Sequence, residues 1–154
     1  MTNTDLINKF YTGFAEGDSN KMAECYHKEV VFKDPAFGTM KGERANNMWK
    51  MLMSKKTADF NFSFGNVEST PETGKATWTA EYQFGDKKRP VVNNVTANFK
   101  FKDGLIIEHI DTFDLYKWSK QALGAPGFLL GWSNFMRKKI QKNANDNLDT
   151  YLSK

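Results

Sequence analysis

Apolar residues near the N-terminus recur at spacings of three and four, which is the pattern of an amphipathic helix. The apolar side of this helix carries Leu6, Ile7, Phe10, Tyr11 and Phe14. Gly17 is typical of a helix end, so we expect the first helix to stop there. Asp18 is a favourable N-cap and predicts a second, short helix whose apolar side carries Met22, Cys25 and Tyr26.

A short strand and a third helix follow. The run Val-Val-Phe at 30–32 predicts a strand that breaks at Asp34-Pro35, because proline lacks a backbone N–H and disfavours helical geometry in the preceding residue. Beyond Gly42 the helical spacing returns and predicts a third helix. Its apolar side carries Ala45, Met48, Trp49, Leu52 and Met53.

The period then changes to two, which is typical of half-buried strands. Alternation runs over 60–64, 76–84, 91–102 and 105–115, and Asp103-Gly104 forms a tight hairpin turn between the last two. These elements predict an α+β fold. In it, a curved antiparallel sheet of four strands and the N-terminal helices enclose an apolar pocket.

Helical spacing reappears after Ala125-Pro126-Gly127 and predicts one long C-terminal helix. Its apolar stripe, about seven turns long, carries Phe128, Trp132, Phe135, Met136, Ile140, Ala144, Leu148, Tyr151 and Leu152. So much apolar surface must cap the mouth of the sheet or pack on a second subunit, which would give a homodimer. No repeat or linker is found, so we expect a single domain over 1–154 with 118–154 as a helical extension.

Composition narrows the class of protein. The net charge is +4, but the basic residues are spread along the chain, and the two tight clusters at 87–89 and 137–139 are expected on solvated surfaces. We therefore expect no nucleic-acid partner. The single Cys25 forms no internal disulfide, the N-terminus lacks a signal-peptide pattern, and no apolar run is long enough for a membrane span. These features predict a cytoplasmic protein without a membrane partner.

Strand alternation indicates which polar side chains are buried. Asn93 is in step with the apolar residues of its strand. In the last strand, His109 and Asp111 share a face, but both faces of that strand carry apolar residues, so periodicity does not choose between them. The apolar residues in step with Asn93 are Val95, Ala97, Phe99 and Phe101, and those in step with His109 are Leu105, Ile107 and Phe113.

Three polar residues are candidates for chemistry. His109 and Asp111 lie about 6.5 Å apart along one strand face, close enough to share a substrate or a water molecule and to transfer protons. The alternative is that His109 only satisfies a core hydrogen bond and Asp111 holds a loop. Asp34 is either a general base or a turn-forming residue before proline. Trp49 and Trp78 are interpreted as pocket walls.

A metal site formed by Asp34, His109 and Asp111 is the weaker interpretation. Neither the strand spacing nor a second nearby histidine supports it, because His27 belongs to a different segment. We expect neither a metal nor another cofactor.

The order of these elements resembles the nuclear transport factor 2-like superfamily, especially ketosteroid isomerase and the SnoaL-like polyketide cyclases. The resemblance covers residues 5–115. It rests on Glu16-Gly17-Asp18, on Asp34-Pro35 with Gly38 and Gly42 after it, and on the stretch Gly-Leu-Ile-Ile-Glu-His-Ile-Asp at 104–111. It implies a cone-shaped fold whose concave sheet face holds a small ligand, and many members are dimers.

The resemblance also implies roles for individual residues. The aspartate of the Asp-Pro step is the proton-shuttling base of the isomerases, which assigns this role to Asp34. The two oxyanion donors do not carry over, because Phe10 replaces the helix tyrosine, with Tyr11 one step off, and Ala97 replaces the strand acid. We therefore do not expect steroid isomerisation. The implied pocket face holds His109 and Asp111 with the ligand-binding candidates Trp49, Trp78, Asn93, Val95, Ala97 and Phe113, and also Ala76.

Limonene-epoxide-hydrolase relatives use an aspartate, arginine, aspartate relay. None of the three arginines, Arg44, Arg89 and Arg137, falls on an expected pocket strand face, so this mechanism is not expected.

Two functional hypotheses follow. In the first, the domain binds a small hydrophobic or carbonyl-containing ligand and acts as an isomerase, cyclase or lyase. Asp34, or His109 with Asp111, transfers a proton next to the carbonyl, and Asn93 orients the ligand. In the alternative, the domain is a non-catalytic ligand-binding or dimeric adaptor module whose working surface is the C-terminal stripe.

Overall fold

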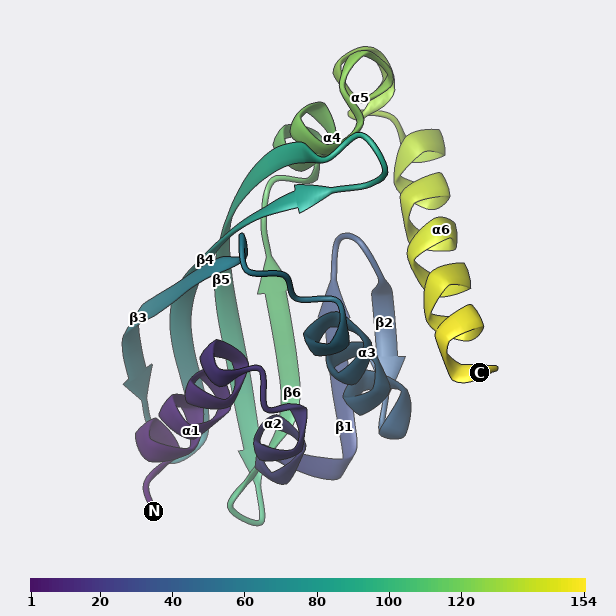
Figure 1. The fold of residues 1–154 in the computed structure, drawn as a ribbon. Coiled ribbons are helices and arrows are strands. Elements are labelled where there is room, and N and C mark those ends of the chain that lie inside the picture. The colour runs from purple at the N-terminus through teal and green to yellow at the C-terminus, as the bar shows by residue number, and fades with distance from the viewer.

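The computed structural model describes residues 1–154 and consists of one curved six-stranded sheet with helices on its inner face and at one end (Figure 1). The strands lie in the order β2-β1-β6-β5-β4-β3. Their bounds are β1 Tyr26–Asp34, β2 Gly38–Lys41, β3 Asn61–Ser69, β4 Thr73–Phe84, β5 Arg89–Lys102 and β6 Leu105–Thr112. The helices are α1 Asn3–Glu16, α2 Ser19–Cys25, α3 Glu43–Ser54, α4 Leu115–Leu123, α5 Ala125–Leu130 and α6 Asn134–Leu152.

The α+β fold with a curved sheet is confirmed, but the expected sheet of four antiparallel strands was too small. Two further strands, β1 and β2, extend it, and β1 pairs with β6 in parallel while all other neighbours are antiparallel. Pro35 lies in the turn between β1 and β2, where its missing N–H breaks no ladder hydrogen bond. The Asp-Pro step therefore ends one strand and begins a hairpin.

The first helix ends and the second begins where the sequence predicts. Thr2 and Asp5 form a capping box at the start of α1, and Gly17 ends it with a left-handed φ of 72°. Asp18 caps α2 by accepting from the backbone N–H of Lys21. The second helix ends at Cys25, however, so Tyr26 opens β1 instead of extending the helical stripe.

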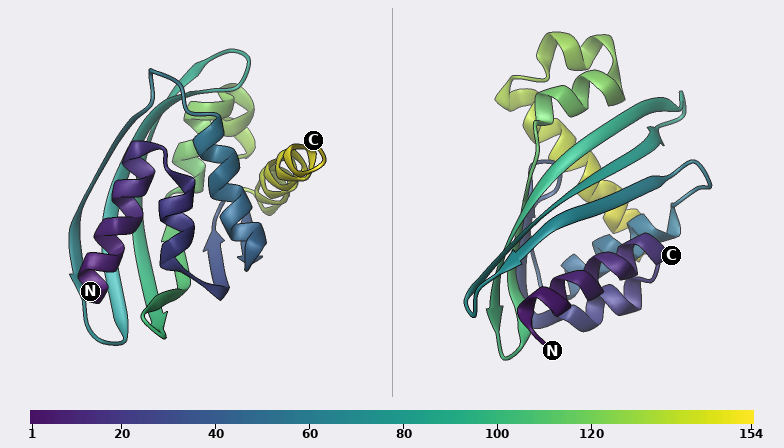
Figure 2. Two further views of the ribbon diagram at one scale, coloured as in Figure 1. Left: turned by 60° about the horizontal axis from the view of Figure 1, so that its bottom comes forward. Right: turned by 90° about the vertical axis from the view of Figure 1, so that its left-hand side faces the viewer.

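Helices α1, α2 and α3 all lie against one face of the sheet, which we call the inner face (Figure 2). They cover the end that holds the β5–β6 turn, here called the hairpin end, and α4 marks the opposite end. Inner-face residues near the hairpin end, such as Ala97 and Phe99, are fully buried, whereas Trp78 and Tyr82 nearer the α4 end are only half-buried. Solvent therefore reaches the inner face from the α4 end.

A bulge decides the face that strand alternation left open. Lys100 pairs with Glu108 but Phe101 pairs with Ile106, so one extra residue of β6 is accommodated between these two pairs. As a result Ile106 and His109 are both fully buried although they are three residues apart. From His109 onward the alternation resumes and places Asp111 on the inner face as well.

The C-terminal region differs from the prediction of one long helix. The last strand stops at Thr112, because Asp114 caps α4 by accepting from the N–H of Lys117. A second break follows α5, where the hydroxyl of Ser133 accepts from the N–H of Met136 and starts α6. The helical region thus begins at Leu115 and contains three helices.

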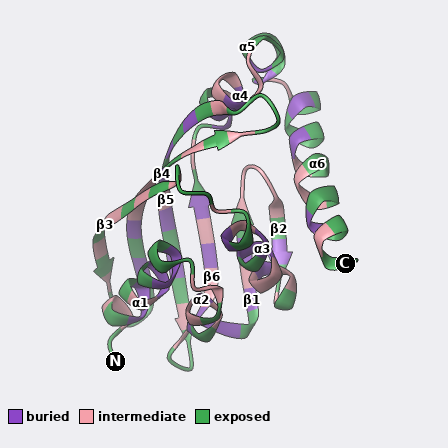
Figure 3. Ribbon diagram, viewed as in Figure 1, coloured by how far each residue is buried: buried purple, intermediate pink, exposed green.

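Helix α6 packs on its own chain, beside α3 and β2 (Figure 3). Leu148 enters the main core with no exposed surface, and Met136 and Ile140 join a second cluster that also contains Trp118. Asn145 donates to the Phe37 carbonyl at 2.9 Å. Four members of the predicted stripe, Phe128, Trp132, Phe135 and Leu152, are instead exposed. None of the helices has the length and apolar character that a membrane span requires.

Candidate functional site on the inner face of the sheet

A chain of hydrogen bonds connects four buried side chains from α3, β1 and β6. The indole Nε1 of Trp49 donates to the hydroxyl of Tyr26 at 2.9 Å, and this hydroxyl lies 2.7 Å from His109 Nδ1. His109 Nε2 lies 2.8 Å from Asp111 Oδ1. All four residues are at most 5% exposed. The two candidates on β6 therefore share one strand face and bond directly to each other.

The direction of these hydrogen bonds follows from the carboxylate at one end and the indole at the other. Carboxylate oxygens only accept, so His109 Nε2–H donates to Asp111 Oδ1. In the neutral imidazole Nδ1 is then the acceptor, and the Tyr26 hydroxyl donates to it while accepting from the Trp49 indole. Every nitrogen and hydroxyl of the four side chains is thus hydrogen-bonded, and one oxygen of Asp111 is held in place.

His109 is enclosed by aromatic rings. Five ring centroids lie within 6.1 Å of the imidazole centroid, and His109 itself has no exposed surface. These rings belong to Phe10, Tyr26, Phe32, Trp49 and Phe99. Both imidazole nitrogens are engaged in hydrogen bonds, which leaves no free lone pair for a metal ion. No cluster of three His, Cys, Asp or Glu side chains suited to a metal is found.

Asp34 lies beside Asp111. Lys33 pairs with Ile110 in the parallel β1–β6 pair, and Asp34 and Asp111 are the next residues of the two strands. The negative charge of Asp111 acts on Asp34. The Asp34 carboxylate also accepts from the backbone N–H of Phe37 at 2.6 Å, which forms the turn after β1. Asp34 and Asp111 therefore lie near one another on adjacent strands. The hydrogen bond to Phe37 also makes Asp34 a turn-forming residue.

The environment of Asp34 favours its protonated form. Burial, together with the negative charge of Asp111, raises the pKa of Asp34 from 3.8 to about 7, although the N–H of Phe37 opposes this change. By surface area the residue is half-buried, so its carboxyl is surrounded by protein but still borders solvent. A carboxyl group with such a pKa both accepts and releases a proton near neutral pH.

Two buried donors on the inner face have no partner. The hydroxyl of Tyr11 and the indole N–H of Trp78 make no hydrogen bond within the chain. Burial and the negative charge of Asp111 raise the pKa of Tyr11 well above its usual value, while the nearby Trp78 lowers it without reaching hydrogen-bond geometry. Both donors therefore lie near one another and near the Asp111 carboxyl. An unpaired buried donor costs about 1–3 kcal/mol, so an acceptor at this place would be stabilising.

The remaining predicted ligand-binding residues lie on the same inner face. Asn93, Val95 and Ala97 follow each other along β5, with exposures of 9%, 2% and 0%. Ala97 pairs with both Asp111 and Ala76, so only small side chains flank the Asp111 carboxyl on that side. Phe113 is half-buried just after β6. Trp49 is not exposed to the site, because its indole is bonded to Tyr26.

Nearer the α4 end, the inner face carries a second hydrogen-bonded pair of aromatic side chains. Trp118 of α4 donates to the hydroxyl of Tyr82 at 2.8 Å. Burial raises the pKa of Tyr82, and the charge of Asp34 contributes to this rise. Tyr82 is therefore hydrogen-bonded to α4 and lies near enough to Asp34 to be affected by its charge.

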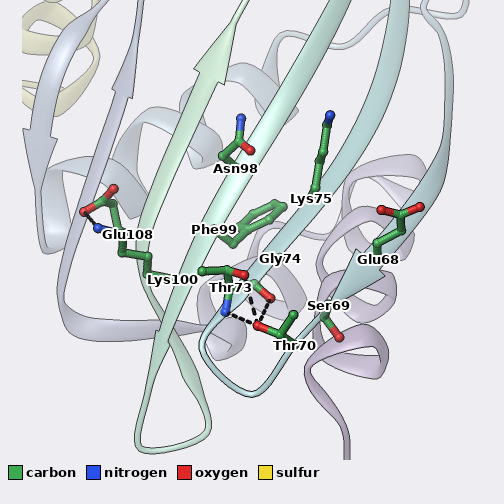
Figure 4. A pocket seen from close by; sticks show the side chains of 10 residues that line it. All are labelled: Glu68, Ser69, Thr70, Thr73, Gly74, Lys75, Asn98, Phe99, Lys100 and Glu108. Carbon is green, nitrogen blue, oxygen red and sulfur yellow. Dashed lines mark hydrogen bonds and ion pairs between the residues drawn. The ribbon is translucent and has the colours of Figure 1, made fainter.

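A separate hollow of about 590 Å³ lies on the surface near the hairpin end (Figure 4). Its lining residues are Glu68, Ser69, Thr70, Thr73, Gly74, Lys75, Asn98, Phe99, Lys100 and Glu108. It is wide and open, and its polar groups are exposed and partly paired with one another, as for Thr70 with Thr73. None of the predicted site residues borders it. We therefore place the candidate site on the inner face.

Sequence reasoning missed two functional candidates of this site. Tyr26 was assigned to a helical stripe, although its position just before a strand run was a signal for β1. Tyr11 was placed on the apolar side of the first helix but one step off the helix tyrosine of the isomerases, so its hydroxyl was not considered as a donor. Two of the three arginines are hydrogen-bonded outside the candidate site. Arg44 bonds Asp149 and Asn145 on α6, and Arg89 bonds the Gln121 carbonyl.

Comparisons with known proteins agree with this architecture. The TerC protein crystallised with polyporic acid has a TM-score of 0.64 at 16% identity, covering 77% of this chain and 96% of its own. A candidate polyketide cyclase from Silicibacter sp. TM1040 has a TM-score of 0.62 at 19% identity, covering 77% and 93%. A limonene-epoxide-hydrolase-like (LEH-like) epoxide hydrolase of M. tuberculosis has a TM-score of 0.61 at 17% identity, covering 81% and 90%. None of the curated proteins matches the sequence.

At these identities the solved structures show a common fold and nothing more. That fold is the nuclear transport factor 2-like one, as in a protein of Cytophaga hutchinsonii with a TM-score of 0.58. The sequence itself matches the model of the SnoaL-like domain over residues 7–109, which is more than half of the chain. The chain therefore belongs to the SnoaL-like domain family.

Proposed function

We propose that this protein binds a small carbonyl compound on the inner face of its sheet and moves a proton at the carbon next to the carbonyl. Asp34 is the base that takes the proton and returns it. Asp111 is the neighbouring carboxylate whose charge adjusts the pKa of Asp34. The observation that carries the proposal is that Asp34 and Asp111 directly follow the paired residues Lys33 and Ile110 of adjacent strands, with Asp111 buried and Asp34 half-buried.

The protonation behaviour of Asp34 supports this role. A carboxyl with a pKa of about 7 is present in both protonation states near neutral pH, which is the condition for an efficient proton shuttle. Two neighbouring carboxyl groups with different surroundings divide the work of acid and base in many enzymes. Here Asp111 is fixed by His109, whereas Asp34 is only half-buried.

The unpaired donors support a ligand with an exposed oxygen. Abstraction of a proton next to a carbonyl places negative charge on the carbonyl oxygen, and donors aimed at that oxygen stabilise the charge. The hydroxyl of Tyr11 and the N–H of Trp78 are two such donors near Asp111, and neither is engaged within the chain. Together they replace the oxyanion donors that the resemblance to ketosteroid isomerase did not supply.

His109 takes a different part from the one first expected. Both imidazole nitrogens are already hydrogen-bonded within the chain, so neither is available to a ligand. Its hydrogen bond orients Asp111, and Tyr26 in turn orients His109. We therefore assign His109 as a positioning residue and Asp34 and Asp111 as the groups that face the ligand.

The structural relatives suggest a class of ligand. Polyporic acid in the TerC structure is the molecule crystallised with a protein of this fold, and another relative is a candidate polyketide cyclase. The half-buried rings of Trp78, Tyr82 and Phe113 on the inner face suit a planar, partly apolar ligand with oxygen substituents. We therefore propose an aromatic or polyketide-like carbonyl compound.

Deuterium exchange tests the proposal without knowledge of the natural substrate. An aryl ketone such as 1-indanone is incubated with the protein in D₂O, and loss of the proton signal next to the carbonyl is followed by NMR. We expect exchange above the buffer rate with the wild-type chain, and a rate lower by about 100-fold or more in Asp34→Asn. Asp86→Asn, a change at an exposed carboxylate, is the matched control and leaves exchange unchanged.

The alternative of a non-catalytic binding module gives a different result. In that case the ketone quenches tryptophan fluorescence in a saturable manner, but the exchange rate in the presence of protein equals that of buffer. Exchange that is equal in the wild-type chain and in Asp34→Asn rejects Asp34 as the base. Absence of both binding and exchange across a set of aryl ketones and quinones rejects the proposed ligand class.

A further inference from the structure

Exposed apolar side chains concentrate at α5 and its junction with α6. Five of the eight large apolar residues that the molecule exposes lie within residues 128–135, each between 45% and 72% exposed (Figure 3). They are Phe128, Leu129, Leu130, Trp132 and Phe135. We call this set the apolar tip. It projects from the end of the molecule at which α4, α5 and the start of α6 meet (Figure 1).

Small residues hold the apolar tip in place. A Cβ atom on Gly127 would overlap the Ser119 carbonyl, and one on Gly131 would overlap the Ser119 hydroxyl, so both glycines pack directly on α4. The hydroxyl of Tyr116 donates to the Phe128 carbonyl at 3.0 Å, and this hydrogen bond also connects α4 to α5. Helix α5 therefore turns its small residues toward the protein and its large apolar residues toward water, which is the reverse of a helix that serves the core.

Positive charge surrounds the apolar tip. Residues 115–145 contain six lysine and arginine side chains and no aspartate or glutamate. The cations are Lys117, Lys120, Arg137, Lys138, Lys139 and Lys142. Because the whole chain has a net charge of only +4, the rest of the molecule is net acidic. Lys142 pairs with Asp146 at 2.6 Å, whereas the other five cations have no acidic partner.

We propose that the apolar tip and its basic surroundings form a docking surface for the interface of an anionic lipid bilayer. Exposed aromatic and leucine side chains beside a group of lysines and arginines are the combination that inserts into the headgroup region of such membranes. Trp132 suits this role, because its indole N–H already donates to the Leu129 carbonyl at 3.0 Å and loses no hydrogen bond on insertion. The proposal is independent of the proposed function.

The charge pattern selects a membrane over other occupants. A second copy docked through the same surface would bring the five cations that have no acidic partner against their own copies, which opposes association. Nucleic acid would neutralise the cations but would leave Leu129 and Leu130 without apolar contact. An anionic bilayer offers negative charge to the cations and an apolar environment to the leucines. The proposal replaces the expectation of no membrane partner, since binding at the surface needs no membrane-spanning helix.

Vesicle sedimentation with the full chain tests this inference. Vesicles of equal parts phosphatidylglycerol and phosphatidylcholine are compared with vesicles of phosphatidylcholine alone. We expect binding to the anionic vesicles to exceed binding to the neutral ones by more than about tenfold, and to weaken at high salt, because salt screens the charges.

Variants separate the two components of the docking surface. The charge reversal Arg137→Glu/Lys138→Glu/Lys139→Glu should weaken binding to anionic vesicles by more than about tenfold. Its matched control reverses three exposed lysines at the hairpin end, Lys28→Glu/Lys75→Glu/Lys102→Glu, and binds as the wild type does. Leu129→Ser/Trp132→Ser should also lose binding, although all charges remain. Circular dichroism confirms that each variant is folded.

Three results would overturn the proposal. The first is equal binding to neutral and anionic vesicles, or no binding to either. The second is an equal loss of vesicle binding in both charge-reversal variants, because the net charge of the protein and not the position of the cations would then determine binding. The third is a dimer in light scattering that Trp132→Ser converts to a monomer, because the apolar tip would then be an interface between copies of this chain.

Discussion

The hydroxyl of Tyr26 lies 2.7 Å from His109 Nδ1 and connects the first residue of β1 to the middle of β6. Because the same hydroxyl accepts from Trp49 of α3, one oxygen atom joins a helix and two strands in the dry core. The proton that it gives to His109 fixes the imidazole, and the imidazole fixes Asp111. The orientation of a carboxyl at the site thus depends on a tyrosine far from solvent.

Tyr26→Phe should destabilise the fold by about 2 kcal/mol, because it leaves the Trp49 N–H and His109 Nδ1 buried without partners. Tyr11→Phe is the matched control. The Tyr11 hydroxyl is equally buried but unpaired, so its removal should leave stability unchanged or raise it slightly. Urea unfolding of both variants measures the difference. Equal losses in the two variants would contradict the bonding pattern described here.

The neutral His109 ring should carry its proton on Nε2. This tautomer follows from the donor of Trp49 and the acceptor of Asp111 at the two ends of the hydrogen-bond chain. Long-range nitrogen–proton NMR correlations distinguish a protonated Nε2 from a protonated Nδ1. Signals of the Nδ1–H form would mean that the Tyr26 hydroxyl donates elsewhere.

Asp34→Asn should remove a dependence of stability on pH. The pKa of Asp34 is 3.8 in its ordinary state and about 7 in the folded chain, so the unfolded chain releases this proton at lower pH than the folded chain does. Ionisation of Asp34 therefore lowers the stability of the wild type as the pH rises from about 4 to about 7.

The full difference in pKa corresponds to about 4 kcal/mol, and partial solvent exposure reduces it, so we expect about 2 kcal/mol. The stability of Asp34→Asn relative to wild type should rise by this amount between the two pH values. Asn keeps an oxygen that accepts from the Phe37 N–H, so the turn after β1 remains. Urea unfolding across this range measures the effect, with Asp86→Asn as the control. Parallel curves for wild type and Asp34→Asn would show that the raised pKa is absent.

Gly127→Ala should separate α5 from α4. The added methyl group would overlap the Ser119 carbonyl, a backbone atom that cannot turn away, and we expect a loss of about 3 kcal/mol. In Gly65→Ala the new methyl group meets no atom within 4 Å, so stability should change by less than about 0.5 kcal/mol. Thermal unfolding compares the two, and hydrogen exchange at α5 amides reports local detachment. A stable Gly127→Ala with protected α5 amides would contradict this close packing.

Leu148→Ala should cost about 3 kcal/mol, because Leu148 inserts from α6 into the main core without exposed surface. Leu152→Ala, one turn further along the same helix, removes the same atoms from a side chain that is 43% exposed. It should change stability by less than about 0.5 kcal/mol. Similar small effects of both changes on urea unfolding would indicate that α6 is not part of the folded core.

Much of the local structure was predictable from the residues alone. Caps at Thr2 and Asp18, the stop at Gly17 and the turn at Asp103-Gly104 all depend on side chains or glycines within a few residues of one another. The inward position of Asn93 likewise follows from strict alternation in a regular strand. Such features are local, and the sequence contains them completely.

Long-range pairing decided the rest. The bulge that turns both Ile106 and His109 inward depends on how β6 meets β5, and the neighbourhood of Asp34 and Asp111 depends on the parallel register of β1 with β6. No periodicity within a single strand encodes either relationship. The amino-acid sequence by itself determined which residues are polar, apolar or helix-ending. Only the tertiary structure decided which of them meet, because contacts between distant segments are set by the packing of the whole sheet.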